Sequence, residues 1–255
     1  MKQFRTLTAL ALCVLLLAGC GGAAAPVETQ SPTTQPATQA TTEATTEATT
    51  EATTEAPTEA ATVAVQAELM GEYDGTTYRN GYLGIGATFG EGWTYYPAEE
   101  LQKVPEIAQQ MLEDADLGDQ YTDAALNNIT TMLCENEEYL VTVNVVYQKL
   151  SLAERLSYAV ISEKDLIDGV VSIADQLAQG YAAQGIIVDS MEAVEVEFLG
   201  GSRYALKTYA SIEDIPYYIL QIYDYKLTGA YGAVITFGSF VEDNTEALLE
   251  LFFTL

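Results

Sequence analysis

Alternating apolar and polar residues predict a series of β-strands in the last two thirds of the chain. Leu83, Ile85, Ala87 and Phe89 share one face of a strand over residues 82–89, because successive strand side chains point to opposite faces. The same period recurs over residues 93–96, 129–134, 139–147, 194–198, 203–210, 217–226 and 229–237. Tight turns join most of these runs, so we expect an antiparallel sheet of about six strands.

The run over residues 139–147 differs from the others because apolar residues occupy both of its faces. One face carries Tyr139, Val141, Val143, Val145 and Tyr147, and the other carries Leu140, Thr142, Asn144 and Val146. This pattern is typical of a central strand that is covered on both sides. Residues 135–138 predict the turn of a hairpin that joins it to the run at 129–134.

Apolar residues spaced by three and four positions predict helices that pack on this sheet. Such a run covers residues 99–115, with Pro105 as its start or as a kink. The longest predicted helix begins after Ser162, a suitable N-cap, and ends at Gly185. A closing helix capped by Asp243 or Asn244 follows through residues 248–252. Together these elements predict an α+β fold.

Residues 1–66 lack this periodicity and predict a signal peptide followed by a linker. Lys2 and Arg5 precede an apolar run over residues 9–18, which is too short to span a bilayer. The tetrad Ala-Thr-Thr-Glu repeats over residues 40–55. Its β-branched threonines, its like charges and its lack of an apolar face favour a disordered, extended spacer. The dense threonines also leave O-glycosylation open.

The run Leu17-Ala18-Gly19-Cys20 resembles the lipobox of bacterial lipoproteins. The resemblance implies that residues 1–19 are removed and that Cys20 carries a thioether-linked diacylglycerol; an ordinary cleaved signal peptide is the alternative. Two or more acyl chains anchor a protein stably. We therefore expect membrane attachment through Cys20 on the outer, extracytoplasmic face of the cell membrane. Residues 20–66 then form the tether, and residues 67–255 form a single globular domain.

The predicted domain carries a second resemblance, over about residues 75–255. Its marks are Tyr78-x-Asn80, Gly84 before Gly92-Trp93, Val143-Asn144-Val145, Gly185, Gly200-Gly201, and the stretch from Glu242-Asp243 through Phe252. With this order of elements, the domain resembles the PsbP-type α-β-α sandwich, and more specifically small lipoproteins of Clostridia-like bacteria. None of these marks is catalytic, so the resemblance implies a fold and a setting but no reaction.

Charge and residue content exclude several classes of function. The chain has 37 acidic and 10 basic residues, a formal net charge of -27, which repels phosphate backbones and makes a nucleic-acid partner untenable. Solubility explains the acidity, and attraction to basic partners is the alternative. The chain has no histidine, which excludes Ser-His-acid and Cys-His arrangements and His-based zinc sites. Cys134 has no obvious disulfide partner and fits a small core residue better than a reactive thiol.

Two motifs that suggest ligands fail on inspection. Gly84-x-Gly86 has Phe89 where a dinucleotide-binding motif needs its third glycine. An EF-hand loop starting at Asp114 would place Asp119 and Ala125 where glycine and glutamate are required. We therefore predict no metal site and no cofactor.

The remaining chemistry favours a binding or scaffolding domain over an enzyme, with an unknown protein or envelope component as partner. Tyr217, Tyr218, Tyr223 and Tyr225 are a possible contact surface. Strand alternation places Tyr218 on one face and the other three on the opposite face, so packing in the core is the alternative. A carboxylate-dependent envelope hydrolase also stays open, with Glu213-Asp214 as the acid pair to inspect, as does small-ligand capture for transport.

Overall fold

The computed structural model describes residues 69–103, 128–182, 185–225 and 229–255. The predicted signal peptide, Leu17, Ala18, Gly19, Cys20 and the linker through residue 66 lie outside these ranges. Most of the predicted helix at residues 99–115 and the acidic stretch at 114–119 also lie outside them. Within the described residues the architecture is α+β, and every strand pair is antiparallel.

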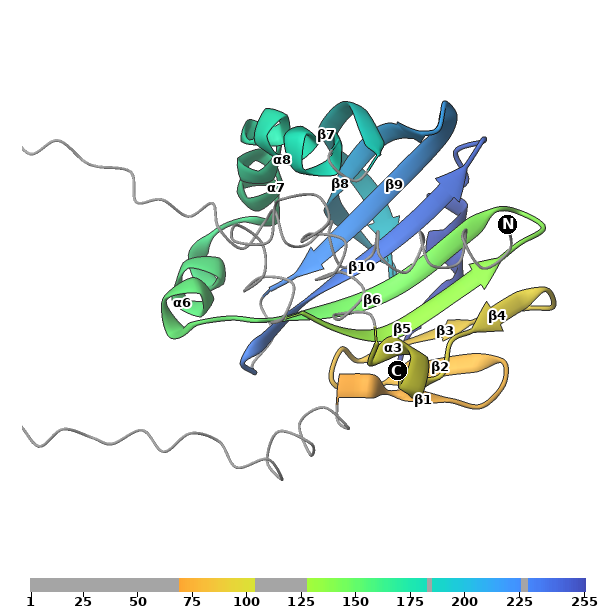
Figure 1. Ribbon diagram of the computed structural model, residues 1–255. Coiled ribbons are helices and arrows are strands. Elements are labelled where there is room, and N and C mark those ends of the chain that lie inside the picture. The colour runs from red at the N-terminus through yellow and green to blue at the C-terminus, as the bar shows by residue number, and fades with distance from the viewer. Residues whose placement is uncertain (1–68, 104–127, 183–184, 226–228) are drawn as a thin grey trace, which may run out of the picture.

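Two sheets replace the predicted sheet of about six strands. The larger sheet has seven strands in the order β4-β5-β6-β10-β9-β8-β7, and the smaller has four in the order β1-β2-β3-β11. Their bounds are β1 Glu72–Tyr73, β2 Thr77–Asn80, β3 Ile85–Thr88, β4 Trp93–Tyr95, β5 Asn128–Asn136, β6 Val141–Lys149, β7 Ile186–Phe198, β8 Gly201–Ile212, β9 Ile215–Asp224, β10 Tyr231–Phe240 and β11 Phe252–Thr254. Figure 1 shows the small sheet beside the β5 end of the large one.

The first core joins the two sheets. Ile85 and Phe89 from the small-sheet region are buried in one cluster with Val143 and Phe237 from the large sheet. Three phenylalanines are in mutual contact there, with ring centroids 5.5–6.2 Å apart, namely Phe198, Phe237 and Phe252. Burying each such side chain contributes roughly 2–3 kcal/mol. Because Phe252 belongs to the C-terminal segment, this core also holds the end of the chain against the large sheet.

Helices pack on the opposite face of the large sheet (Figure 1). They are α6 Leu152–Val160, α7 Glu163–Ser172 and α8 Ala174–Ala182, while the short α3 Ala98–Leu101 follows β4. The prediction of one long helix is wrong, because the chain breaks at Ile173. Gly169 and the β-branched residues that follow it have low helix propensity. The predicted N-cap is confirmed: the Ser162 hydroxyl accepts a hydrogen bond of 3.1 Å from the Asp165 N–H.

The predicted central strand is confirmed as β6, in which every residue from Val141 to Gln148 is buried. It pairs with β5 as predicted, and the turn lies at residues 137–140 instead of 135–138.

The predicted closing helix is wrong in type and extent. The chain forms a 3₁₀ helix, η1 Ala247–Leu251, whose N-cap residue Glu246 makes no side-chain capping bond. Residues 252–254 then form β11, which pairs with β3. Asp243 is not the N-cap of η1: its Oδ1 accepts a hydrogen bond from the Thr245 N–H, before the helix begins, and its Oδ2 pairs with Lys207 of β8.

Candidate functional site

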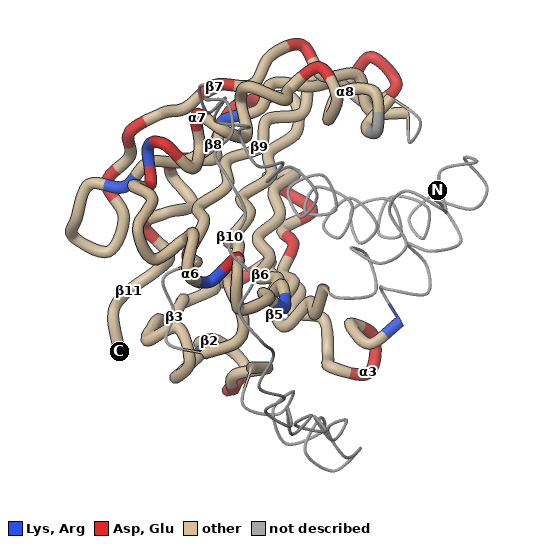
Figure 2. Tube along the Cα trace, turned by 90° about the vertical axis from the view of Figure 1, so that its left-hand side faces the viewer, with Lys and Arg blue, Asp and Glu red and all other residues tan. Residues whose placement is uncertain are grey.

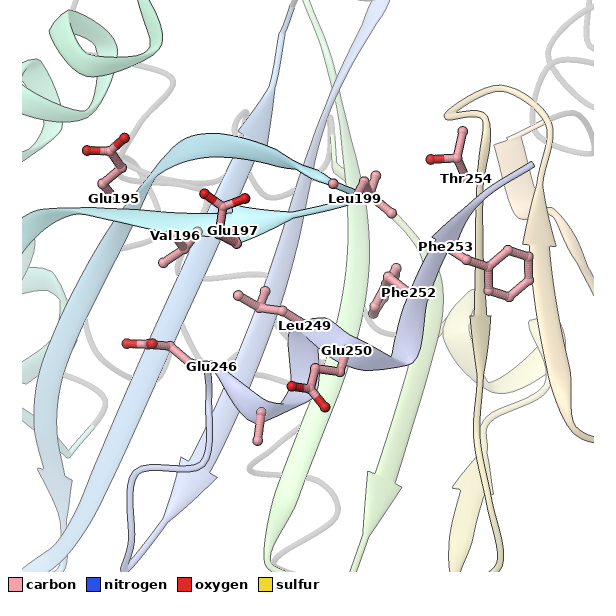
Figure 3. Close-up of a pocket in the computed structure, with 12 residues that line it drawn as sticks. Glu195, Val196, Glu197, Leu199, Glu246, Leu249, Glu250, Phe252, Phe253 and Thr254 are labelled. Atoms are coloured by element: carbon pink, nitrogen blue, oxygen red, sulfur yellow. The ribbon is translucent and has the colours of Figure 1, made fainter.

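A groove of about 810 Å³ lies where the end of β7 meets the C-terminal segment. Its floor is apolar and includes Val196, Leu249 and Phe252. Figure 3 shows Glu195 and Glu197 on β7, Glu246 and Glu250 at η1, and Leu249 between the two pairs. The groove therefore combines an apolar floor with an acidic rim, and each lining residue that carries a charge is a glutamate.

The β7 wall is an edge strand. β7 stands at the end of the large sheet and pairs only with β8 among the described strands. Its sequence contains four acidic residues and no basic one, and all four acids are exposed: Asp189, Glu192, Glu195 and Glu197. Figure 2 shows acidic positions along this part of the trace. A long edge strand presents backbone donors and acceptors, so β7 offers a row of both beside the groove.

The turn that ends β7 determines which of these backbone groups point outward. Phe198 pairs with Gly201 across the two loop residues Leu199 and Gly200, which have φ of 56° and 78°. Such a two-residue turn closes on a hydrogen-bonded pair, and the next pair along the hairpin is not hydrogen-bonded. The N–H and C=O groups of Glu197, and two residues earlier of Glu195, therefore point away from β8 toward the open edge.

An ion pair between a buried lysine and a partly exposed aspartate holds the C-terminal wall of the groove against the sheet. The Lys207 side chain is 3% exposed, and its Nζ lies 2.6 Å from Oδ2 of Asp243 and 2.6 Å from Oγ1 of Thr245. Partial burial alone would raise the pKa of Asp243, but hydrogen bonds from Lys207 and Thr245 outweigh it and hold that pKa below its ordinary 3.8. The contact fixes the segment that leads into η1.

The other side of the groove is the end strand of the small sheet. Phe252 and Thr254 of β11 pair with Ala87 and Ile85 of β3. Phe253 approaches Gly86 so closely that a Cβ at this glycine would lie 2.3 Å from its ring. The groove therefore lies between the last strand of each sheet, β7 and β11.

The predicted tyrosine contact surface is wrong for three of its four members. Tyr217, Tyr223 and Tyr225 are at most 5% exposed and belong to the core under the helices. Tyr218 lies on the opposite face, partly buried, in an edge-to-face contact with Tyr209 at 5.9 Å. The predicted division of faces is thus confirmed, and burial removes the three core tyrosines from any exposed surface.

The other candidate residues either have structural roles or lie outside the described residues. Cys134 is fully buried and free, and burial raises the pKa of its thiol, as expected of a core residue. Glu213 and Asp214 form the exposed turn between β8 and β9, both with positive φ. The lipid-attachment residue Cys20 and the preceding Leu17, Ala18 and Gly19 lie outside the described residues.

Neither a metal cluster nor a membrane-spanning helix emerges from the described ranges. No three or more His, Cys, Asp or Glu side chains there lie close enough to hold a metal ion, so the groove glutamates do not converge on one point. No helix there is long and apolar enough to cross a membrane.

The sequence pattern does not single out the groove glutamates as a site. The alternation of Val194, Val196 and Phe198 with acids marks a polar strand face. It does not reveal that this strand lies at an edge, nor that residues 246–254 lie beside it. The available signal was the run of four acids without a compensating base.

Comparisons with known proteins find matches among solved structures. No family model matches the chain, and no curated protein matches it. Among solved structures, the chain is similar to the solution structure of cyanobacterial PsbP (CyanoP) from Synechocystis sp. PCC 6803. The match has 12% identity and a TM-score of 0.34, and covers 73% of this chain and 99% of that one. The α+β architecture follows directly from the strands and helices of the described residues.

Proposed function

We propose that this protein is a lipid-anchored, extracytoplasmic binding protein that captures a cationic partner in the groove beside β7. The observation that carries the proposal is the groove itself, whose apolar floor is bordered by Glu195, Glu197, Glu246 and Glu250 without a basic residue in its lining. An apolar centre with a charged rim is the usual anatomy of a protein-binding patch. The rim selects a positive partner, and the floor excludes water from its apolar side chains.

The anchor is the second half of the proposal and rests on the sequence alone. The resemblance of Leu17-Ala18-Gly19-Cys20 to a lipobox supports lipid attachment at Cys20, and residues 21–66 would carry the domain away from the membrane. A tethered acidic domain meets partners at the cell surface, where the tether confines its search.

The anchor is tested with Cys20→Ala in a bacterial host. We expect the wild-type chain to sediment with membranes and to incorporate a fatty-acid label, whereas the variant does neither. Equal membrane retention and equal labelling of the two would overturn the lipid-anchor proposal.

Binding is tested with the full chain and a fluorescent decapeptide of alternating lysine and valine. We expect saturable binding that weakens with salt, since the rim charges are exposed and screened. The double variant Glu195→Gln with Glu197→Gln should weaken it by about twofold to tenfold, from the loss of two exposed charge pairs. The control Glu99→Gln with Glu100→Gln removes the same charge at α3, which follows β4, the strand at the opposite end of the sheet from β7. Equal effects of both double variants would contradict a groove site.

A further inference from the structure

We propose that the cationic partner binds as an added β-strand, an extended segment that pairs with the outer edge of β7. This inference rests on the proposed function and specifies the geometry of capture. Strand addition uses main-chain hydrogen bonds for affinity and alternating side-chain sites for specificity. The β7 edge has the length for it, 13 residues, and no strand paired with its outer side among the described residues.

The backbone of β7 presents donors and acceptors at the right spacing. The N–H and C=O groups of Glu195 and Glu197 point toward the open edge, because each occupies a non-hydrogen-bonded pair with β8. A strand laid along this edge would exchange hydrogen bonds with alternate β7 residues. It would extend the large sheet by one strand and run directly beside the groove.

The side chains around this edge define the chemistry of the added strand. Glu195 and Glu197 point to one face of β7, and the buried Val196 points to the other, toward the core that contains Leu249 and Phe252. Side chains of a paired strand alternate in the same way. The edge therefore fits a segment in which lysine or arginine alternates with small apolar residues, the cations on the glutamate side.

The dispersion of the acids favours a peptide over a metal ion. The described acids form no group that could hold a metal ion, so the rim charges are spread along the edge. Spread charges match cations that are themselves spaced along an extended chain.

Charge also excludes the two occupants that this chain could supply. A second copy paired through β7 would bring its own acids against Glu195 and Glu197, and like charges directly opposite each other are destabilising. The linker of this chain repeats glutamate in every tetrad over residues 40–55 and is repelled in the same way. The occupant is therefore a segment of a different, basic protein.

The experiment separates charge from backbone pairing with two substitutions at one position. Glu197→Gln removes the charge and keeps the N–H, whereas Glu197→Pro removes both and places a ring on the open edge. Proline is tolerated on edge strands where the N–H faces away from the partner strand. We expect Glu197→Gln to weaken binding of the lysine–valine decapeptide about twofold to fivefold. We expect Glu197→Pro to weaken it by a further tenfold, roughly, or more.

A second measurement leaves the protein unchanged, in case Glu197→Pro disturbs the hairpin. The same decapeptide methylated at every backbone nitrogen keeps its side chains and charges but has no backbone donor. We expect methylation to weaken peptide binding to the wild-type chain. This loss of affinity should be at least as large as the loss that Glu197→Pro causes with the unmethylated peptide.

The outcomes distinguish the two proposals. Equal binding by both Glu197 variants, together with equal binding of both peptides, would overturn strand addition while leaving the cationic groove intact. No binding of the unmethylated decapeptide to the wild-type chain would overturn the groove proposal itself, and strand addition with it.

Discussion

The two edges of the large sheet are protected from unwanted pairing in different ways. β4 has three residues, and the ring of Tyr95 stacks on Tyr73 of the small sheet at 4.0 Å. β7 has thirteen residues and is protected by exposed acids. Short edges and charged edges are both established means of preventing aggregation. A three-residue edge offers few backbone groups for pairing, whereas a long acidic edge repels acidic strands and attracts basic ones.

The largest expected effect comes from removing the ion pair that fixes the groove's C-terminal wall. Lys207→Met leaves Asp243 without its partner, and we expect a loss of about 2–3 kcal/mol in the free energy of unfolding, because Asp243 is partly exposed. The control Lys164→Met breaks an exposed helical pair with Asp168 and should leave stability unchanged. Urea unfolding measures both, and equal losses would contradict a special role for Lys207.

The same ion pair predicts a pH dependence. Because the folded-state pKa of Asp243 lies below 3.8, its stabilising contribution is fully present above about pH 4. That contribution is lost as the pH falls through the folded pKa. The stability difference between the wild-type chain and Asp243→Asn should therefore be constant from pH 7 to pH 5 and shrink below pH 4. Unfolding curves across this pH range measure the stability difference. A difference that grows toward low pH would contradict a lowered pKa of Asp243 in the folded state.

A smaller effect is expected at the turn that sets the pairing of β7. Gly200 has φ of +78°, which an L-residue adopts at a cost, so Gly200→Ala should destabilise the protein by about 1 kcal/mol. Gly201→Ala is the matched control, because its φ is not in the left-handed region and open space surrounds its Cβ position. If thermal unfolding shows similar losses of stability for the two variants, the left-handed conformation of Gly200 in this turn is contradicted.

The smallest effect on stability, and the most informative about the two edges, comes from neutralising β7. The triple change of Glu192, Glu195 and Glu197 to glutamine should alter the free energy of unfolding by less than about 0.5 kcal/mol, because all three side chains are exposed. It should nevertheless promote self-association, which light scattering at increasing protein concentration detects. The control changes Glu91, Glu99 and Glu100 near β4. Self-association of the control variant but not of the β7 variant would show that charge protects the β4 edge and not the β7 edge.

The sequence was sufficient for features that depend on neighbours along the chain. The alternation in residues 139–147 predicts a strand buried on both faces, and β6 has this property. The Ser162 cap and the placement of Tyr217 and Tyr218 on opposite faces of β9 follow from local geometry, and both are confirmed. Each of these needs only the period of a strand or the first turn of a helix.

Features that depend on distant partners were beyond the sequence. Asp243 is a good N-cap residue in isolation, but its carboxylate binds Lys207, 36 residues earlier in the chain, and the predicted helix gives way to η1 and β11. The alternation of apolar and polar residues also does not reveal which strand lies at the edge of a sheet. The position of the β7 acids beside a groove could therefore not be predicted. The groove exists only because residues 246–254 pack beside this edge.

Residue-resolved amide exchange tests strand addition at β7 most directly. NMR exchange rates are measured for the free chain and for the chain saturated with the lysine–valine decapeptide. We predict that the peptide protects the amides of Glu195 and Glu197, which point outward, and leaves the already paired amides of Val194 and Val196 unchanged. Saturation by the peptide with unchanged exchange at Glu195 and Glu197 would contradict the addition of a strand.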